Sequence, residues 1–520
     1  MSDIPPGRPA DSRARHGGPI ASSGTVARNT LWNLAGMVLP AVAAVAAIPV
    51  LVARLGEARF GVLTLAWGLS LLFALSDLGL ARATTTLLAR SWSSAPVRER
   101  AGLLWASLAG QAGLGLAGGG VFALVTPWMV TSLLEVPADL HMEARRAFYL
   151  LALSIPFVLA GNPFRSVLET TQQFGALNAV RIPSSTLNYA GPLLMVPFTI
   201  RLEAIVGVIV ATRVAGLVAF AWLAVREAPA VFQPTMPSAK STRALMRIGG
   251  WLGATGIALP AIASLDRVII GARLSIAEVG YYAAPYEVVT KLWFLSGSLL
   301  PVLYPVFSAL DDEARLKRVY WRAVRGLFVP TVAAAAVMIA FSSEVFSLWL
   351  GPEFGAHAIP VARWLALGVV LNVVGQVPMT LLQSRGRPEL PAAVHLIEVP
   401  LYALAAWWLA GVAGTAGVAI AWTGRAAFEA VIVFGAASVV LPSARSGRDL
   451  RGPIVMAAVG AALLALAGWL GTRPDGWLAW KAAGMAIGLT FFAAWSWRRL
   501  FDASDRRLLA RGVLAPPHGE

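Results

Sequence analysis

Charged side chains inside long apolar runs are the residues of this sequence most able to do chemistry. On insertion scales, a charge at the centre of a bilayer costs about 2.5–3.5 kcal/mol, so such a residue is a candidate for function. Asp266 and Arg267 are the most deeply embedded adjacent pair, in IASLDRVIIG (262–271). Because neighbouring residues on a helix point in different directions, we expect these two to have different partners.

Two further sets of charges lie within or at the ends of apolar runs. Asp77 and Arg82 follow an uncharged run, and they either reach the membrane interface or face an internal cavity and its mouth. Glu287 and Lys291 are four residues apart, a spacing that forms an ion pair within a helix. Arg213 has no acid on its own helix face, so its partner must come from another helix, from lipid or from a substrate.

A third set lies nearer the C-terminus. His395 and Glu398 are three residues apart and share one helix face, which suits either a proton or Na⁺ site or a polar patch satisfied by neighbouring helices. Arg425 and Glu429 repeat the ion-pair spacing in the opposite order. Of this set, His395 and Glu398 are the candidates for ion coupling.

Few other chemistries fit the sequence. It contains no cysteine, which excludes disulfides, thiolate metal sites and cysteine nucleophiles. The histidines do not have metal-ligand spacing. GLGLAG (113–118) matches a nucleotide-binding pattern, but it lies inside an apolar run with no strand before it. We therefore expect a protein that is not an enzyme and that has no cofactor and no metal.

The composition indicates where these charges are held. Of the 520 residues, 57% are hydrophobic and 13% are charged, whereas a soluble protein has about 25% charged residues. The apolar runs are about 20 residues long, which is the length needed to cross a bilayer as a helix. The sequence therefore predicts an all-α, polytopic membrane protein of about fourteen transmembrane helices. The expected spans are 30–53, 60–82, 102–130, 147–168, 176–200, 203–225, 245–270, 280–308, 321–341, 360–383, 391–410, 414–440, 452–471 and 475–497.

The basic residues predict the orientation of the chain. They favour alternate loops by roughly threefold, which places both termini in the cytoplasm. The formal net charge of +15 is then explained by topology, so we expect no nucleic-acid partner.

Two similar stretches recur in the two halves of the chain. VGVIVATRVAG (206–216) resembles AGVAIAWTGRA (416–426), an offset of about 210 residues that indicates a parallel repeat of six spans. Two extra helices follow the repeat. The expected parts are a disordered N-terminus (1–28), an N-lobe (29–225), a cytoplasmic linker (226–244), a C-lobe (245–440), two further spans (441–498) and a cytoplasmic tail (499–520).

Four stretches together resemble the Wzx-type flippases of lipid-linked oligosaccharides, within the multidrug/oligosaccharidyl-lipid/polysaccharide exporter superfamily. They are LGEARFGVLTLAWGLSLLFALSDLGL (55–80), DRVIIGARLSIAEVGYYAAPYEVV (266–289), FSSEVFSLWLGPEFGAHAIPVARWLALG (341–368) and LLQSRGRPELP (381–391).

The resemblance implies a function and a site. A two-lobed carrier would move undecaprenyl-diphosphate-linked oligosaccharide across the bacterial inner membrane by alternating access. A cationic cavity lined by spans 1, 2, 7 and 8 would receive the diphosphate. The implied binding residues are Arg28, Asp77, Arg82, Asp266, Arg267, Glu287 and Lys291. Arg213 is a further binding candidate because its charge has no acid on its own helix face.

Other functions and partners stay open at this point. The alternatives are a multidrug or cation antiporter of the same superfamily and a lipid II flippase. A polysaccharide polymerase is disfavoured because it would carry large external loops. The expected partners are the lipid-linked oligosaccharide, membrane lipid, and a polymerase with its assembly proteins, and we expect the protein to be a monomer.

Overall fold

The chain forms helices throughout the part that can be described. The computed structural model describes residues 23–75, 77, 79–256, 258–442, 451–501 and 506. The α-helices are α1 (Ser23–Leu55), α2 (Glu57–Leu75), α3 (Leu80–Ser91), α4 (Val97–Trp128), α5 (His141–Thr170), α6 (Phe174–Met195), α7 (Leu202–Glu227), α8 (Ala239–Gly256), α9 (Ala258–Arg273), α10 (Ile276–Val289), α11 (Trp293–Ala309), α12 (Glu313–Ala340), α13 (Ser342–Leu350), α14 (Pro352–Ser384), α15 (Glu389–Val440), α16 (Arg451–Gly471) and α17 (Leu478–Arg499).

Short helical turns connect some of these elements: η1 (Met129–Leu133), η2 (Ala138–Leu140), η3 (Pro229–Phe232), η4 (Thr290–Leu292) and η6 (Asp475–Trp477).

The helices have the length and composition of membrane spans. Within the described ranges, ten helices are long and apolar enough to cross a bilayer, so the prediction of an all-α, multi-pass membrane protein is confirmed. One of the ten, α15, covers two predicted spans, 391–410 and 414–440. Its backbone leaves the helical conformation at Ala413 and Gly414, where Gly414 has φ 60°, a value that glycine adopts without steric penalty. The number of fourteen spans stays a prediction.

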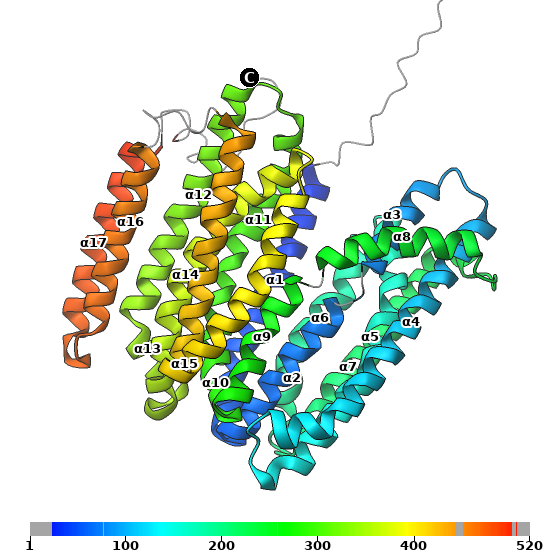
Figure 1. Ribbon diagram of the computed structural model, residues 1–520, viewed down its shortest axis with the longest axis horizontal. Helices are drawn as coiled ribbons and strands as arrows, with labels where there is room; N and C mark the ends of the chain where they lie inside the picture. Colours follow the sequence, from blue (N-terminus) through cyan, green and yellow to red (C-terminus); the bar gives the residue numbers. More distant parts are fainter. Residues whose placement is uncertain are drawn as a thin grey trace, which may run out of the picture.

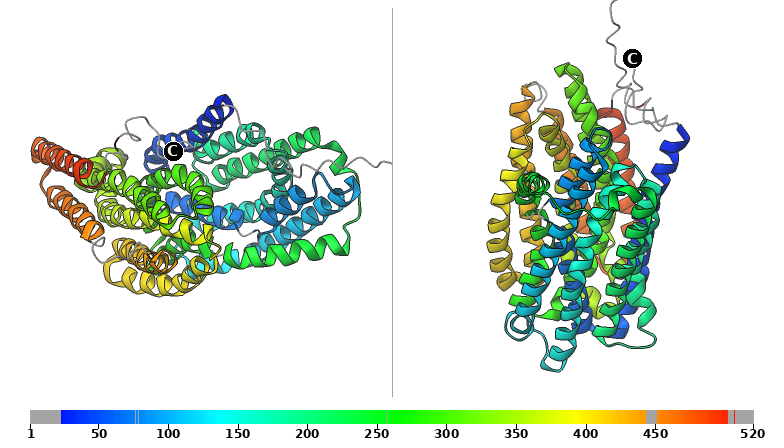
Figure 2. Two further views of the ribbon diagram at one scale, coloured as in Figure 1. Left: turned by 90° about the horizontal axis from the view of Figure 1, so that it is seen from above. Right: turned by 90° about the vertical axis from the view of Figure 1, so that its right-hand side faces the viewer.

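The helices form two bundles that meet at one end and diverge toward the other (Figure 1). In the first bundle, α4, α5, α6 and α7 pack against one another, and α1 packs on α6. In the second bundle, α14 is central and contacts α10, α11, α12, α13 and α15. The α16–α17 pair packs against α12 at the far edge of the second bundle (Figure 2).

Two helices cross between the bundles. α2 follows α1 in sequence, yet it packs mainly against α9 and α10 of the second bundle. α8 contacts α3 and α4 of the first bundle, whereas α9 packs on α15 (Figure 1). Leu245 of α8 is buried with Leu88 and Leu104 in the core of the first bundle. The range 245–270, predicted as one span of the second half, is therefore divided between α8 and α9, which pack on different bundles.

The end at which the bundles meet is sealed by main chain as well as by side chains. A Cβ atom on Gly61 of α2 would lie 1.7 Å from the carbonyl oxygen of Ile276 on α10, so only glycine permits this approach. The backbone N–H of Glu135 donates to Gly271 O over 2.9 Å, and Ile276 N–H donates to Glu135 O over 3.4 Å. The loop after α4 is thus joined to the α9–α10 turn.

Candidate functional site

A cavity of about 900 Å³ lies between the two bundles. Helices α1, α2, α5, α6 and α7 line one side, and α9, α10, η4 and α11 line the other. Its position follows from the breaks in the helices. α10 ends at Val289 and continues through the 3-10 turn η4 into α11, which presents Glu287, Thr290 and Lys291 to the cavity. This is the arrangement expected of a carrier with its site between two repeats.

The cavity lining is strongly cationic. Its ionised side chains are Arg165, Arg181, Arg213, Arg267, Lys291 and Glu287. Five cations face one carboxylate, which is an excess of four positive charges among the described residues. Because charges in a bilayer are costly, such an excess indicates a ligand that carries negative charge.

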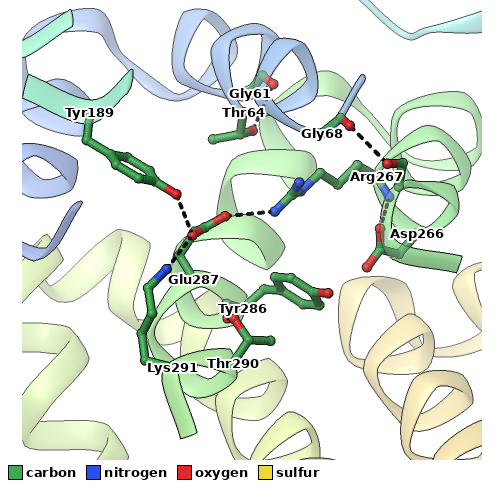
Figure 3. A network of polar contacts seen from close by, with 11 residues as sticks. Gly61, Thr64, Gly68, Tyr189, Asp266, Arg267, Tyr286, Glu287, Thr290 and Lys291 are labelled. Atoms are coloured by element: carbon green, nitrogen blue, oxygen red, sulfur yellow. Dashed lines mark hydrogen bonds and ion pairs between the residues drawn. The ribbon is translucent and has the colours of Figure 1, made fainter. Parts of the chain in front are cut away.

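The cations of the second bundle are paired within the protein, and we call Arg267, Glu287 and Lys291 the C-wall. Arg267 Nη2 donates to Glu287 Oε1 over 3.1 Å, and Lys291 Nζ donates to Glu287 Oε2 over 3.2 Å (Figure 3). The Arg267 guanidinium also lies 5.2 Å from the centre of the Tyr286 ring. The predicted ion pair between Glu287 and Lys291 is therefore formed, and Glu287 also binds Arg267.

Glu287 of the C-wall contacts α6 of the first bundle, and α9, which carries Arg267, contacts α2. The Tyr189 hydroxyl of α6 donates to Glu287 Oε2 over 2.9 Å (Figure 3). Ser264 Oγ of α9 donates to the carbonyl oxygen of Gly68 on α2 over 2.9 Å. A Cβ atom on Gly68 would lie 2.8 Å from Arg267 Nη1, so this glycine makes room for the guanidinium.

The cations of the first bundle lack close carboxylate partners among the described residues. We call Arg165, Arg181 and Arg213 the N-wall. Arg213 Nη1 donates to the neutral hydroxyl of buried Ser154 over 2.8 Å. Arg165 lies 3.8 Å from Glu169, at the limit of an ion pair. Arg181 is exposed and has no hydrogen bond or ion pair within the described part of the chain. A guanidinium carries five N–H donors, so most of the donors on this wall are available.

The structure separates the predicted binding residues into two groups. Arg213, Arg267, Glu287 and Lys291 line the cavity. Asp266 is buried and is not among the residues that line the cavity. Its Oδ1 accepts the backbone N–H of Arg267 over 2.7 Å. The two adjacent residues therefore have different surroundings.

Asp77 and Arg82 are not among the residues that line the cavity. Asp77 caps α3, because its Oδ1 accepts Gly79 N–H over 3.0 Å and its Oδ2 accepts Ala81 N–H over 2.7 Å. The α2–α3 break explains why a carboxylate follows the apolar run, since a helix N-terminus favours negative charge. Arg82 is exposed and is not among the lining residues. The backbone of Arg28 lies in α1, and its side chain falls outside the described part of the structure.

Arg165 and Arg181 are cavity residues that the sequence analysis missed. Each lies within a predicted span, 147–168 for Arg165 and 176–200 for Arg181. The criterion that selected Arg213, a charge within an apolar run, would have selected both of them.

A second polar network lies inside the second bundle. Arg425 Nη1 donates to Glu398 Oε2 over 3.2 Å and to Glu429 Oε2 over 3.0 Å. His395 Nδ1 lies 3.2 Å from Glu398 Oε2, and Asn372 Nδ2 donates to Glu429 Oε2 over 3.2 Å. Glu398 and Glu429 are both buried. Two carboxylates thus share one guanidinium, and the buried network lacks one positive charge unless His395 or a carboxylate is protonated.

Comparisons with known proteins place the chain among transport proteins. A family model described as polysaccharide biosynthesis protein matches residues 26–311, which is more than half of the chain. A Shigella flexneri protein named as a candidate O-antigen transporter is 24% identical over 409 residues, covering 79% of this chain and 97% of that protein.

Two solved structures share the fold. The lipid II flippase MurJ in its inward closed conformation has a TM-score of 0.71 at 11% identity, covering 91% of this chain and 99% of the MurJ chain. An inward-facing multidrug resistance MATE family transporter of the MOP superfamily has a TM-score of 0.62 at 14% identity, covering 81% of this chain and 96% of that one. These relatives are transporters or flippases and not enzymes.

Proposed function

This chain belongs to the polysaccharide biosynthesis protein family, and from that membership we propose that it flips an undecaprenyl-diphosphate-linked oligosaccharide across the bacterial inner membrane. The observation that carries the proposal is the charge of the cavity, where five cations face one carboxylate. Arginine suits a diphosphate because its planar fork bonds two oxygens at once. Arg213, whose partner among the described residues is a neutral hydroxyl, would donate to the substrate.

The aromatic lining supports a glycan head. Trp67, Tyr189, Trp293 and Phe294 line the same cavity as the arginines. Aromatic rings offer an apolar face with a polar edge, and the C–H faces of sugars pack on such rings. The diphosphate would bind the cations while the oligosaccharide lies against these rings.

The proposed mechanism is alternating access. With both termini in the cytoplasm, the end sealed by α2 and α10 would face the periplasm and the cavity would open toward the cytoplasm. Rocking of the two bundles about the cavity would then expose the head to the other leaflet. Arg82, which is exposed near the N-terminus of α3, would contact lipid phosphate on the cytoplasmic side.

The buried network of the second bundle is our candidate for ion coupling. Glu398 and Glu429 share Arg425, so binding of one proton or Na⁺ would balance the charge, and His395 adjoins Glu398. A gradient that supplies this cation would drive the change between conformations. Substituting Glu429→Gln removes the excess charge, so it should abolish the dependence of transport on the gradient while substrate binding persists.

Deletion of the gene tests the proposed function. We expect lipid-linked oligosaccharide to accumulate in the cytoplasmic leaflet and surface glycan to disappear. The wild-type gene should restore the glycan, and Arg213→Gln should not, although the variant protein is inserted normally. Unchanged surface glycan together with new drug sensitivity would instead support a multidrug antiporter.

A lipid II flippase is the second candidate, because MurJ shares the fold over most of both chains. The two functions differ in the glycan. Rescue of a strain depleted of its lipid II flippase would favour the second candidate.

We propose that the protein acts as a monomer beside a polysaccharide polymerase and its assembly proteins, which copurification after crosslinking would test.

A further inference from the structure

Glu287 is the one carboxylate that lines the cavity among the described residues. Both of its oxygens are occupied, because Oε1 accepts from Arg267 and Oε2 accepts from Lys291 and Tyr189 (Figure 3). Its side chain is 13% exposed, whereas that of Lys291 is 40% exposed. An anion that enters the cavity can therefore reach Lys291, but it must compete with a carboxylate that is already bound.

Such a carboxylate weakens the attraction of the cavity for any anion. A cavity built only to bind anions tightly would omit Glu287, and Arg267 and Lys291 would then lose the carboxylate that they share. The bilayer around the protein contains many anionic heads, since its cytoplasmic leaflet carries a negative surface potential. Each phosphate in these heads is a diester with one negative charge, and the heads are far more abundant than any lipid-linked intermediate.

We propose that Glu287 is an internal competitor that makes the cavity selective for lipid heads carrying two or more negative charges. This inference rests on the proposed function, and it names the residue that distinguishes the substrate from ordinary anionic lipid.

Charge balance gives the physical reason. When a singly charged head binds Lys291, its charge only replaces that of Glu287 as the partner of Lys291. This exchange therefore contributes little to the free energy of binding. A diphosphate places a second charge in the same cavity, where Arg181 and Arg213 lack carboxylate partners within the described residues. Specificity is a difference between two affinities, and Glu287 would raise that difference by lowering the affinity for the singly charged head more than for the diphosphate.

Two matched probes test the proposal with the full-length protein in lipid nanodiscs. They are a short-chain prenyl diphosphate sugar and the prenyl monophosphate sugar with the same tail and sugar, which carry two charges and one charge. We expect the wild type to bind the diphosphate probe more tightly by about tenfold or more. In Glu287→Gln the monophosphate probe should gain affinity, so that the preference falls to about twofold.

Three further variants complete the test. Glu287→Asp keeps the charge and should keep the preference. Glu389→Gln removes an acid of the surface pair with Arg387, changes the net charge by the same amount and should also keep it. If Glu287→Gln does not fold, the double variant Arg267→Gln/Glu287→Gln removes both members of the buried pair, frees Lys291 and should lose the preference.

Three outcomes would overturn the inference. An unchanged preference in Glu287→Gln and in the double variant removes the role of the carboxylate, and equal binding of both probes by the wild type removes the selectivity. Both of these leave the proposed function standing. Binding of neither probe by the wild type would count against the proposed function as well.

Discussion

The two walls of the cavity carry similar cations and differ in how the protein compensates them. On the C-wall, Arg267 is 4% exposed and shares Glu287 with Lys291. On the N-wall, Arg213 has a serine hydroxyl and Arg165 has a carboxylate 3.8 Å away. Removing one partner of a buried ion pair is strongly destabilising because it leaves the other charge uncompensated, whereas a charge without a counter-charge is available to bind a ligand. From this comparison we propose that the N-wall makes the first contact with the substrate.

The largest effect should come from removing the unmatched cations. Arg181→Gln combined with Arg213→Gln should reduce transport by about 100-fold or more, because each hydrogen bond to a charged group contributes about 1.5–3 kcal/mol. The thermal unfolding midpoint in detergent should stay the same, since no carboxylate loses its partner. The measurement is flipping of lipid-linked oligosaccharide in reconstituted vesicles. Transport within a fewfold of wild type would end the assignment of the N-wall to substrate.

Removing Arg267 should affect stability in a way that N-wall substitutions do not. Arg267→Gln leaves Glu287 without its most buried partner. The expected loss in the free energy of unfolding is about 3 kcal/mol, at the low end for a broken buried pair because Lys291 remains. Arg213→Gln is the matched control. Equal unfolding midpoints for the two variants would show that the walls do not differ in this respect.

Tyr189 tests the contact between α6 of the first bundle and the C-wall. Tyr189→Phe removes one hydrogen bond to Glu287. This loss should favour the conformation that opens to the periplasm by about 1.5 kcal/mol and raise the population of that conformation about tenfold. The chain has no native cysteine, so Ser70→Cys in the cavity wall provides a single site for labelling from the periplasm. We expect faster labelling in the Tyr189→Phe background. An unchanged rate would mean that this bond does not hold the bundles together.

Arg82 should give the smallest effect. It is exposed and lies outside the cavity, so Arg82→Gln should reduce transport by less than about threefold, in line with the small contribution of exposed charge contacts. Loss of transport as severe as that of the N-wall variant would place Arg82 in the substrate path.

Much of the fold follows from composition. An apolar run that crosses a bilayer must satisfy its own backbone hydrogen bonds, and a helix does so within the run. The resemblance to the polysaccharide exporters is confirmed by the family match. The ion pair between Glu287 and Lys291 was also predictable, since residues four apart on a helix are neighbours. These are local properties of sequence.

Features that depend on packing between helices were not predictable in the same way. The sequence gives no direct sign that α8 packs on the first bundle while α9 packs on the second. Arg181 and Arg82 are both arginines near apolar runs, yet one lines the cavity and the other does not. The rotation of each helix about its axis decides this difference, and that rotation is fixed by partners far away in the sequence.

The contact of Gly61 with the Ile276 carbonyl has a consequence for the permeability barrier of the cell. A transporter of large hydrophilic heads needs a wide vestibule, and any gap at its far side would let protons and salts leak down their gradients. Side chains that plug such a gap change rotamers on the nanosecond scale, but touching peptide groups have no rotamers to change. If the chain carries the proposed substrate, the closed end of the cavity would rely in part on Gly61, because a Cβ atom at this position would push the two peptide groups apart.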